Sequence, residues 1–236
     1  MSDPRMVLVA HGTRNPRGVE MIASLADAVS ERVGRTRVAF VDVLGPAPAE
    51  VLRELDGPAV VVPAFLASGY HVHTDVPREV AASEHPEVVV TRALGPDPVL
   101  TQVLIRRLVE AGWCPGDSVV LAAAGSSDPR ALRDVRVAAA MLSEAVGARV
   151  EIGYVATGQP RVPDVVARVR RGGAEKVFVA SYLLARGLFH DRLSEAGADG
   201  VAQPLGVDPD VVGLLEDRFV AAADSLLATA PYRSAR

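Results

Sequence analysis

VVVPAFLASGYHVHTDVP, residues 60–77, joins a short apolar run to a loop of small residues that carries two histidines. Val60 to Pro63 predicts a buried strand, because β-branched apolar residues lead into a proline. His71 and His73 follow in the loop, and Asp75 before Val-Pro is predicted to cap a new helix. Open α/β sheets bind ligands at the carboxyl ends of their strands, so this loop is the first place to expect chemistry.

The composition allows a sizeable core and excludes several classes of partner. The 236 residues fit one large domain or two of about half that length. A net charge of −4 provides no basic surface for nucleic acid. No apolar run approaches the roughly 20 residues of a membrane span, and the N-terminus lacks a signal-peptide pattern, so we expect a cytoplasmic protein without a membrane partner. The single cysteine, Cys114, excludes an internal disulfide and a cysteine-cluster metal site.

Strands and helices are predicted to alternate through the first half of the chain. Short β-branched runs alternate with segments of helical apolar spacing, and this order is typical of a parallel sheet covered on both faces. The expected strands are Met6–Ala10, Val38–Val43, Val60–Pro63 and Val88–Thr91. The expected helices are Val19–Val33, Ala47–Leu55, Asp75–Ser83 and a helix that Asp97 caps and that runs to about Ala111.

The same order then begins again after the turn at residues 112–117. Four segments of the first half recur in the same order in the second half. Residues 6–10 correspond to 118–123, residues 11–16 to 124–129, residues 60–67 to 177–184, and residues 94–98 to 205–209. We therefore predict two tandem, pseudo-symmetric α/β domains, residues 1–115 and 116–236, each a parallel sheet flanked by helices. Residues 231–236 are expected to form a frayed tail.

The two copies differ in polar residues at the ends of strands. A duplicated fold needs its apolar core in both copies, whereas reactive groups are needed only where the reaction takes place. In the second copy His11 is replaced by Ala124, Asp42 by Ala156 and His71 by about Phe189. Because all three replacements are apolar, we predict one functional site, carried by the N-terminal half.

The chemistry of these three residues points to a metal. Two histidines and a carboxylate at the ends of successive parallel strands are expected to meet at one edge of the sheet. Neutral imidazoles with a carboxylate suit a borderline divalent ion such as Fe²⁺, Co²⁺ or Ni²⁺ and leave coordination positions open. His73 either assists His71 or faces solvent, and the sequence leaves both alternatives open.

Two other classes of protein use similar residues. Histidine phosphatases also place a histidine before glycine at the end of the first strand, but they need an arginine before it, and this chain has Ala10. A metal or tetrapyrrole carrier would use the same ligands without turnover. A carrier needs a closed coordination shell, which two histidines and one aspartate do not provide, so the pattern favours an enzyme.

Four motifs, spread over the first half and echoed in the second, resemble one family. They are His-Gly-Thr-Arg from His11, Phe-Val-Asp-Val from Phe40, the run from Phe65 through Gly69-Tyr70-His71 to Pro77, and Leu-Gly-Pro-Asp-Pro from Leu94. The whole chain resembles the sirohydrochlorin chelatases, class II enzymes that insert cobalt or ferrous iron on the routes to cobalamin and sirohaem, in the form with two fused half-units. Asp42 stands where that family usually has glutamate.

The resemblance implies roles for individual residues. His11 and His71 would hold the metal and accept protons from the macrocycle, while Asp42 would balance charge or relay a proton. The metal would be a substrate, with no permanently bound cofactor. Sirohydrochlorin carries many carboxylates, which suit arginine. The candidate substrate-binding residues, in a cleft between the halves, are Arg14, Arg78, Arg186, Arg192, Ser68 and Gly69.

Overall fold

The computed structural model describes residues 3–229 and contains two four-stranded, fully parallel sheets. The tail at 231–236 lies outside the described residues. The predicted α/β class is confirmed. The first sheet has the order β2-β1-β3-β4, with β1 Arg5–Ala10, β2 Arg37–Phe40, β3 Ala59–Pro63 and β4 Val88–Val90. The second has the order β6-β5-β7-β8, with β5 Ser118–Gly125, β6 Val150–Thr157, β7 Val177–Tyr182 and β8 Gly200–Val201.

Helices follow the strands, and several begin at an Asx-Pro pair. Asn15 caps the first helix by accepting from the Arg17 amide at 3.0 Å, which starts that helix at Pro16, ahead of the predicted Val19. No helix among residues 3–229 is long and apolar enough to cross a bilayer. The helices are α1 Pro16–Val33, α2 Pro48–Arg53, α3 Val76–Ser83, α4 Pro98–Glu110, α5 Pro129–Val146, α6 Val162–Arg171, α7 Leu188–Asp191 and α8 Pro209–Thr229, with a π-turn η1 at His71–Asp75 and a 3₁₀ turn η2 at Arg192–Glu195.

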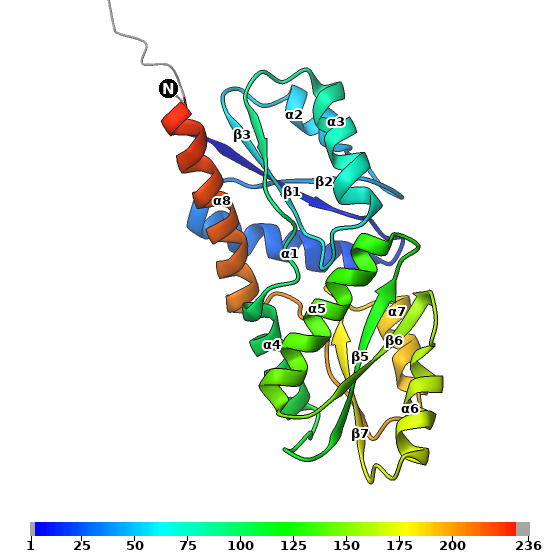
Figure 1. The fold of residues 1–236 in the computed structure, drawn as a ribbon. Coiled ribbons are helices and arrows are strands. Elements are labelled where there is room, and N and C mark those ends of the chain that lie inside the picture. The colour runs from blue at the N-terminus through cyan, green and yellow to red at the C-terminus, as the bar shows by residue number, and fades with distance from the viewer. Residues whose placement is uncertain (1–2, 230–236) are drawn as a thin grey trace, which may run out of the picture.

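The final helix of each half packs on the other half. α4 follows the first sheet in the chain but lies against β7 and α5 of the second half, whereas α8 lies against α1 and β3 of the first (Figure 1). One apolar cluster consequently runs through both halves and includes Leu8, Leu104, Leu121 and Leu215. The two halves therefore share one core. The boundary that we propose near residue 115 divides the two copies of the sequence repeat, and the core crosses it.

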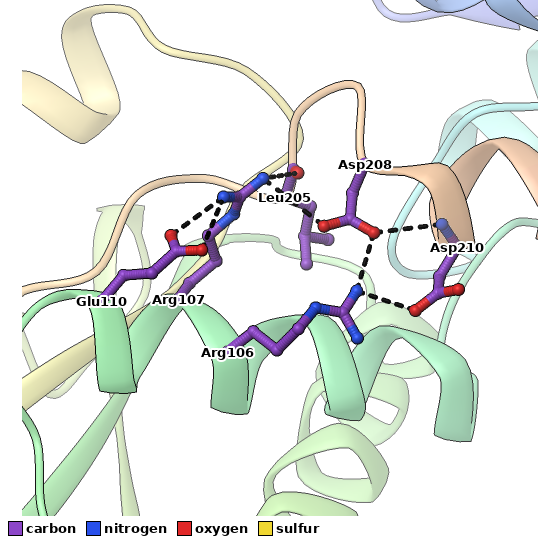
Figure 2. A network of polar contacts seen from close by, with 6 residues as sticks. All are labelled: Arg106, Arg107, Glu110, Leu205, Asp208 and Asp210. Atoms are coloured by element: carbon purple, nitrogen blue, oxygen red, sulfur yellow. Dashed lines mark hydrogen bonds and ion pairs between the residues drawn. The ribbon is translucent and has the colours of Figure 1, made fainter.

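Reciprocal ion pairs join the two exchanged helices at their N-termini. Asp97 caps α4 and accepts from Arg218 of α8 at 2.7 Å. Asp208 accepts from the Asp210 amide at the start of α8 and from Arg106 of α4 at 2.7 Å, as Figure 2 shows. Each repeated Asp-Pro motif therefore does two jobs: it starts its own helix and binds that helix to the other half.

Matching hydrogen bonds confirm how the two copies align. The Phe40 amide donates to Pro46 O at 2.9 Å, and the Tyr154 amide donates to Pro160 O at the same distance. Phe40 lies opposite Ala10 in the first sheet, and Tyr154 lies opposite Ala123 in the second. By this correspondence Ala124 occupies the place of His11, and Ala156 the place of Asp42.

The third strands align in the same way. Pro63 lies opposite Val9 on β1, and Ser181 lies opposite the equivalent Ala122 on β5. Counting forward from these partners brings Gly187 to the position of Gly69 and Phe189 to the position of His71. The His73 amide donates to Gly69 O and the Asp191 amide donates to Gly187 O, which agrees with Phe189 at the position of His71.

Two predicted strands end earlier than expected. The strand predicted over Val38–Val43 ends at Phe40, because the chain turns sharply, with the Leu44 amide donating to Asp42 O at 2.7 Å and Val43 at a positive φ of 68°. Asp42 consequently lies in a loop. The strand predicted over Val88–Thr91 ends one residue earlier, at Val90.

Candidate functional site

His11 and His71 meet at the carboxyl edge of the first sheet. Their ring centroids lie 4.6 Å apart, with the planes tilted by 37°. His11 follows the last residue of β1 directly, and His71 opens the π-turn η1 after β3. Gly12 makes the first loop possible, because its φ is +98° and a Cβ there would lie 2.0 Å from the Asp42 carbonyl oxygen. The fold thus places two imidazoles side by side.

A buried carboxylate orients the second histidine. His71 Nδ1 lies 2.7 Å from Asp75 Oδ2, and the other carboxylate oxygen pairs with Arg78 at 3.0 Å. An ionised carboxylate only accepts, so Nδ1 carries the proton and Nε2 keeps its lone pair for a metal or a proton. The predicted cap role of Asp75 is wrong: its side chain makes no capping bond, because the turn around it is helical and its carboxylate turns back to His71.

A cavity of about 550 Å³ opens beside the histidines and is lined by both halves. The first half contributes His11, His71 and the loop after β3; the second contributes the loop after β5, Ala156 and Phe189. No Asp, Glu, Lys or Arg of the described chain lines it. Its volume is in the range of small-molecule sites, and its apolar walls suit a flat, largely apolar ring.

The second half also supports the histidine loop. Asp134 of α5 accepts from the Ser68 amide at 2.7 Å, and the Tyr182 hydroxyl donates to Leu66 O at 2.8 Å. Burial raises the pKa of Tyr182 far above its ordinary value, so the phenol keeps its proton and remains a donor. The loop that carries His71 is therefore held from across the cavity.

Asp42 does not join the histidine pair. Its carboxylate is exposed and accepts from the amide of its own neighbour Val43 at 2.7 Å, and Asp42 does not line the cavity. Within the described part of the chain, no group of three or more His, Cys, Asp or Glu side chains could hold a metal ion. The protein therefore offers two imidazoles, and the carboxylate nearest to them is Asp75's, bound to His71.

The predicted substrate-binding residues have separate positions. Gly69 lines the cavity, while Ser68 uses its amide for Asp134. Arg78 is tied to Asp75. Arg14 and Arg192 are exposed and line no described cavity, Arg186 lines a second, smaller cavity, and His73 is exposed.

The sequence analysis missed the roles of three residues at the site. Asp75 could have been found from its spacing to His71, since residues four apart meet on one helical face. Asp134 and Tyr182 gave no such signal, because both act across the boundary between halves. Their roles depend on how the halves pack.

The sequence model of one family matches both halves. The CbiX family matches residues 5–111 and again residues 118–222. The chain belongs to the CbiX family. The double match agrees with the repeat inferred from the four recurring segments, and the histidine pair lies in the first of the two CbiX units.

Relatives and solved structures support the same assignment. The sirohydrochlorin ferrochelatase of Priestia megaterium is 24% identical over 204 residues, 80% of this chain and 76% of the relative. The sirohydrochlorin cobaltochelatase of Methanothermobacter thermautotrophicus is 29% identical and aligns over 45% of this chain and 91% of its own length. SirB from Bacillus subtilis with Fe³⁺ superposes with a TM-score of 0.82 at 21% identity, covering 97% of this chain and 98% of that one. The fold is therefore that of a CbiX-type chelatase.

Proposed function

We propose that this protein inserts a divalent metal ion, Co²⁺ or Fe²⁺, into sirohydrochlorin. The observation that carries the proposal is the His11–His71 pair on an uncharged cavity in a CbiX-family fold. Relatives named as ferrochelatases and as cobaltochelatases both align with the chain, which supports the reaction type for either metal.

The reaction needs a metal donor and a base on one face of the macrocycle. A free-base tetrapyrrole must lose two pyrrole protons when it takes up a divalent ion. The Nε2 of His71, free because Asp75 binds Nδ1, can hold the ion or accept a proton, and His11 lies beside it to do the other. Two protein ligands leave the ion's other positions to water and to the ring nitrogens, so the ion can leave the protein.

The lining of the cavity orients the substrate. Apolar walls from Phe65, Leu183 and Phe189 suit the faces of the ring, whereas the carboxylates of sirohydrochlorin find no counter-charge inside. These carboxylates must therefore point out of the cavity toward solvent. This orientation presents the ring nitrogens, and not the substituents, to the histidines.

Two imidazole ligands do not distinguish Co²⁺ from Fe²⁺, so the ion that is inserted depends mainly on which ion is available to the protein. Imidazole binds Co²⁺ and Fe²⁺ alike, with affinities that follow the general order of divalent ions. We accordingly expect both ions to be accepted in vitro.

The decisive experiment is an anaerobic insertion assay. Purified protein is mixed with sirohydrochlorin and either Co²⁺ or Fe²⁺, and the tetrapyrrole absorption spectrum is followed against a reaction without protein. We expect acceleration that His71→Ala abolishes while the variant's far-ultraviolet circular dichroism stays unchanged. Stoichiometric binding of ion or tetrapyrrole with insertion at the uncatalysed rate would instead identify a carrier.

A further inference from the structure

A second cavity, of about 350 Å³, lies on the other side of the loop that follows β7. It is lined by α1, α4, that loop and the segment after β8, through Arg17, Met21, Arg107, Arg186, Gln203, Pro204 and Gly206. Leu184 of the same loop lines the histidine cavity, but no residue lines both. The two cavities are therefore separate, although one short loop borders both.

The lining of this second cavity is strongly positive. It contains three arginines and, among the described residues, no carboxylate. The side chains of Arg17 and Arg186 have no ion-pair partner within residues 3–229. Arg107 is already paired, with Glu110 at 2.9 Å and Asp208 at 3.5 Å. Two uncompensated guanidinium groups in one concavity attract an anion and repel cations.

Two residues of the same walls, Arg107 and Gln203, carry buried side-chain atoms without a hydrogen-bond partner in the described chain. The guanidinium nitrogens at the tip of Arg107 bind Glu110, Asp208 and Leu205 O, as Figure 2 shows. Its Nε is buried and has no hydrogen-bond partner in the described chain, and the same is true of the Gln203 side-chain oxygen. A buried polar atom without a partner is costly, which marks this wall as incompletely satisfied in the described chain.

We propose that this cavity is an oxyanion-binding site that takes a carboxylate or phosphate group. Arg17 and Arg186 provide the charge and the guanidinium donors for the anion, and Arg107, held by Glu110 and Asp208, forms part of the wall behind them. Gln203 adds a second polar group at the wall, which its amide can present as donor or acceptor. The proposal concerns binding alone and stands whether or not the histidine cavity performs metal insertion.

Calorimetric titration with inorganic phosphate at low ionic strength tests the site. We expect saturable binding of one phosphate per chain, weakened roughly tenfold or more by Arg17→Gln and by Arg186→Gln. Arg35→Gln is the matched control: it removes an exposed arginine just beyond the opposite end of α1, about 27 Å along the helix from Arg17. The absence of saturable binding, or equal weakening by Arg35→Gln, would overturn the proposal.

Nuclear magnetic resonance gives a readout located at the wall of this cavity, through Arg107. The Arg107 Nε–H resonance, assigned by its absence from Arg107→Lys, should shift on addition of phosphate in the original protein and stay in place in the double variant Arg17→Gln/Arg186→Gln. A phosphate that binds without moving this resonance lies elsewhere, and the assignment of the site would then be wrong.

A competition arm identifies the source of the anion. If phosphate competes with sirohydrochlorin and the double variant weakens tetrapyrrole binding, the site holds a carboxylate of the substrate's rim. If tetrapyrrole binding is the same in both proteins while phosphate binding is lost, the ligand is a free anion. Either result supports the oxyanion site. Neither depends on the insertion assay, so a failure of that assay would count against the proposed function and not against this site.

Discussion

The two halves present the same loops to one cavity, but only the first half presents reactive groups. His11 and His71 lie where the second half has Ala124 and Phe189, and all four residues line the same space. The histidine of the second half is His190, whose Nε2 lies 3.2 Å from Ala202 O. It lines no described cavity. The difference suggests a division of labour: one half carries the chemistry, and the other forms the opposing wall and supports the reactive loop.

The largest effect is expected from substituting, one at a time, the equivalent residues His71 and Phe189. His71→Ala should lower the insertion rate by roughly 10²–10⁴-fold, since it removes a metal ligand or base. Phe189→Ala, at the equivalent position, should mainly raise the substrate KM, since it removes apolar wall. Steady-state insertion kinetics of both variants check this. A comparable loss of kcat in both variants would show that the two halves do not divide chemistry and substrate binding between them.

A large effect on stability is expected at the exchanged helices. Arg218 and Asp97 have side chains 10% and 8% exposed, whereas Arg106, the partner of Asp208, is 45% exposed. Arg218→Met should lower the free energy of unfolding by roughly 3 kcal/mol, because it leaves a buried carboxylate without its closest partner. Arg106→Met should cost about 1 kcal/mol or less, since its side chain is exposed and the pair is screened by solvent. Each aspartate keeps a second arginine, Arg92 near Asp97 at 3.4 Å and Arg107 near Asp208 at 3.5 Å, so exposure is the difference between the pairs.

Urea unfolding measures both variants under the same conditions. The ratio of the two losses is the test, since both substitutions keep an apolar stem. Equal losses would show that burial does not distinguish the two ion pairs.

A smaller effect on activity is expected at the carboxylate that orients His71. Asp75→Asn keeps the shape but removes the charge that holds the Nδ1 proton, and outer partners of metal-binding histidines typically contribute about 10–100-fold. Co²⁺ affinity and insertion rate should both fall by that factor, less than in His71→Ala. Unchanged Co²⁺ affinity would mean that Asp75 serves Arg78 and the turn alone.

The smallest effect is expected at Tyr182, whose equivalent in the first half is Ala64. Tyr182→Phe should lower the free energy of unfolding by about 1 kcal/mol, through loss of the hydrogen bond to Leu66 O.

The same substitution should change the pH dependence of stability. Burial raises the pKa of Tyr182 in the folded protein, while the unfolded phenol ionises near pH ~10. Above that pH the unfolded state binds fewer protons, so the stability present below it is lost as the pH rises. The free energy of unfolding, measured at a series of pH values across this range, should fall less steeply with pH for Tyr182→Phe. Parallel curves would rule out this contribution.

Periodicity and caps were enough to predict most of the secondary structure. Asp97 caps α4 as predicted, and the apolar runs became the buried strands. The exchange of α4 and α8 was not predictable, because either sheet accepts an amphipathic helix equally well, and the choice depends on pairs such as Arg218 with Asp97. Loop length and apolar spacing contain no information about which sheet a helix will cover.

The candidate site was predicted in part for a similar reason. Comparing the copies singled out His11 and His71, which the structure brings to one cavity. The position of Asp42 depends on the turn after Phe40, and a side chain that bonds its own backbone neighbour cannot be recognised from spacing. The contacts of Asp134 and Tyr182 with the histidine loop join residues far apart in the chain, so no local pattern contains them.

The position of α8 sets the order in which the molecule can be completed during synthesis. The ribosome makes the first sheet early, yet the helix that packs on β3 is made after both sheets. We expect stalled nascent chains that stop before α8 to leave the first half open to protease, and chains that expose residues 209–229 to become resistant in one step. The first half to be translated is then the last to close, and the fold around the reactive histidines is completed only after residues 209–229 have emerged.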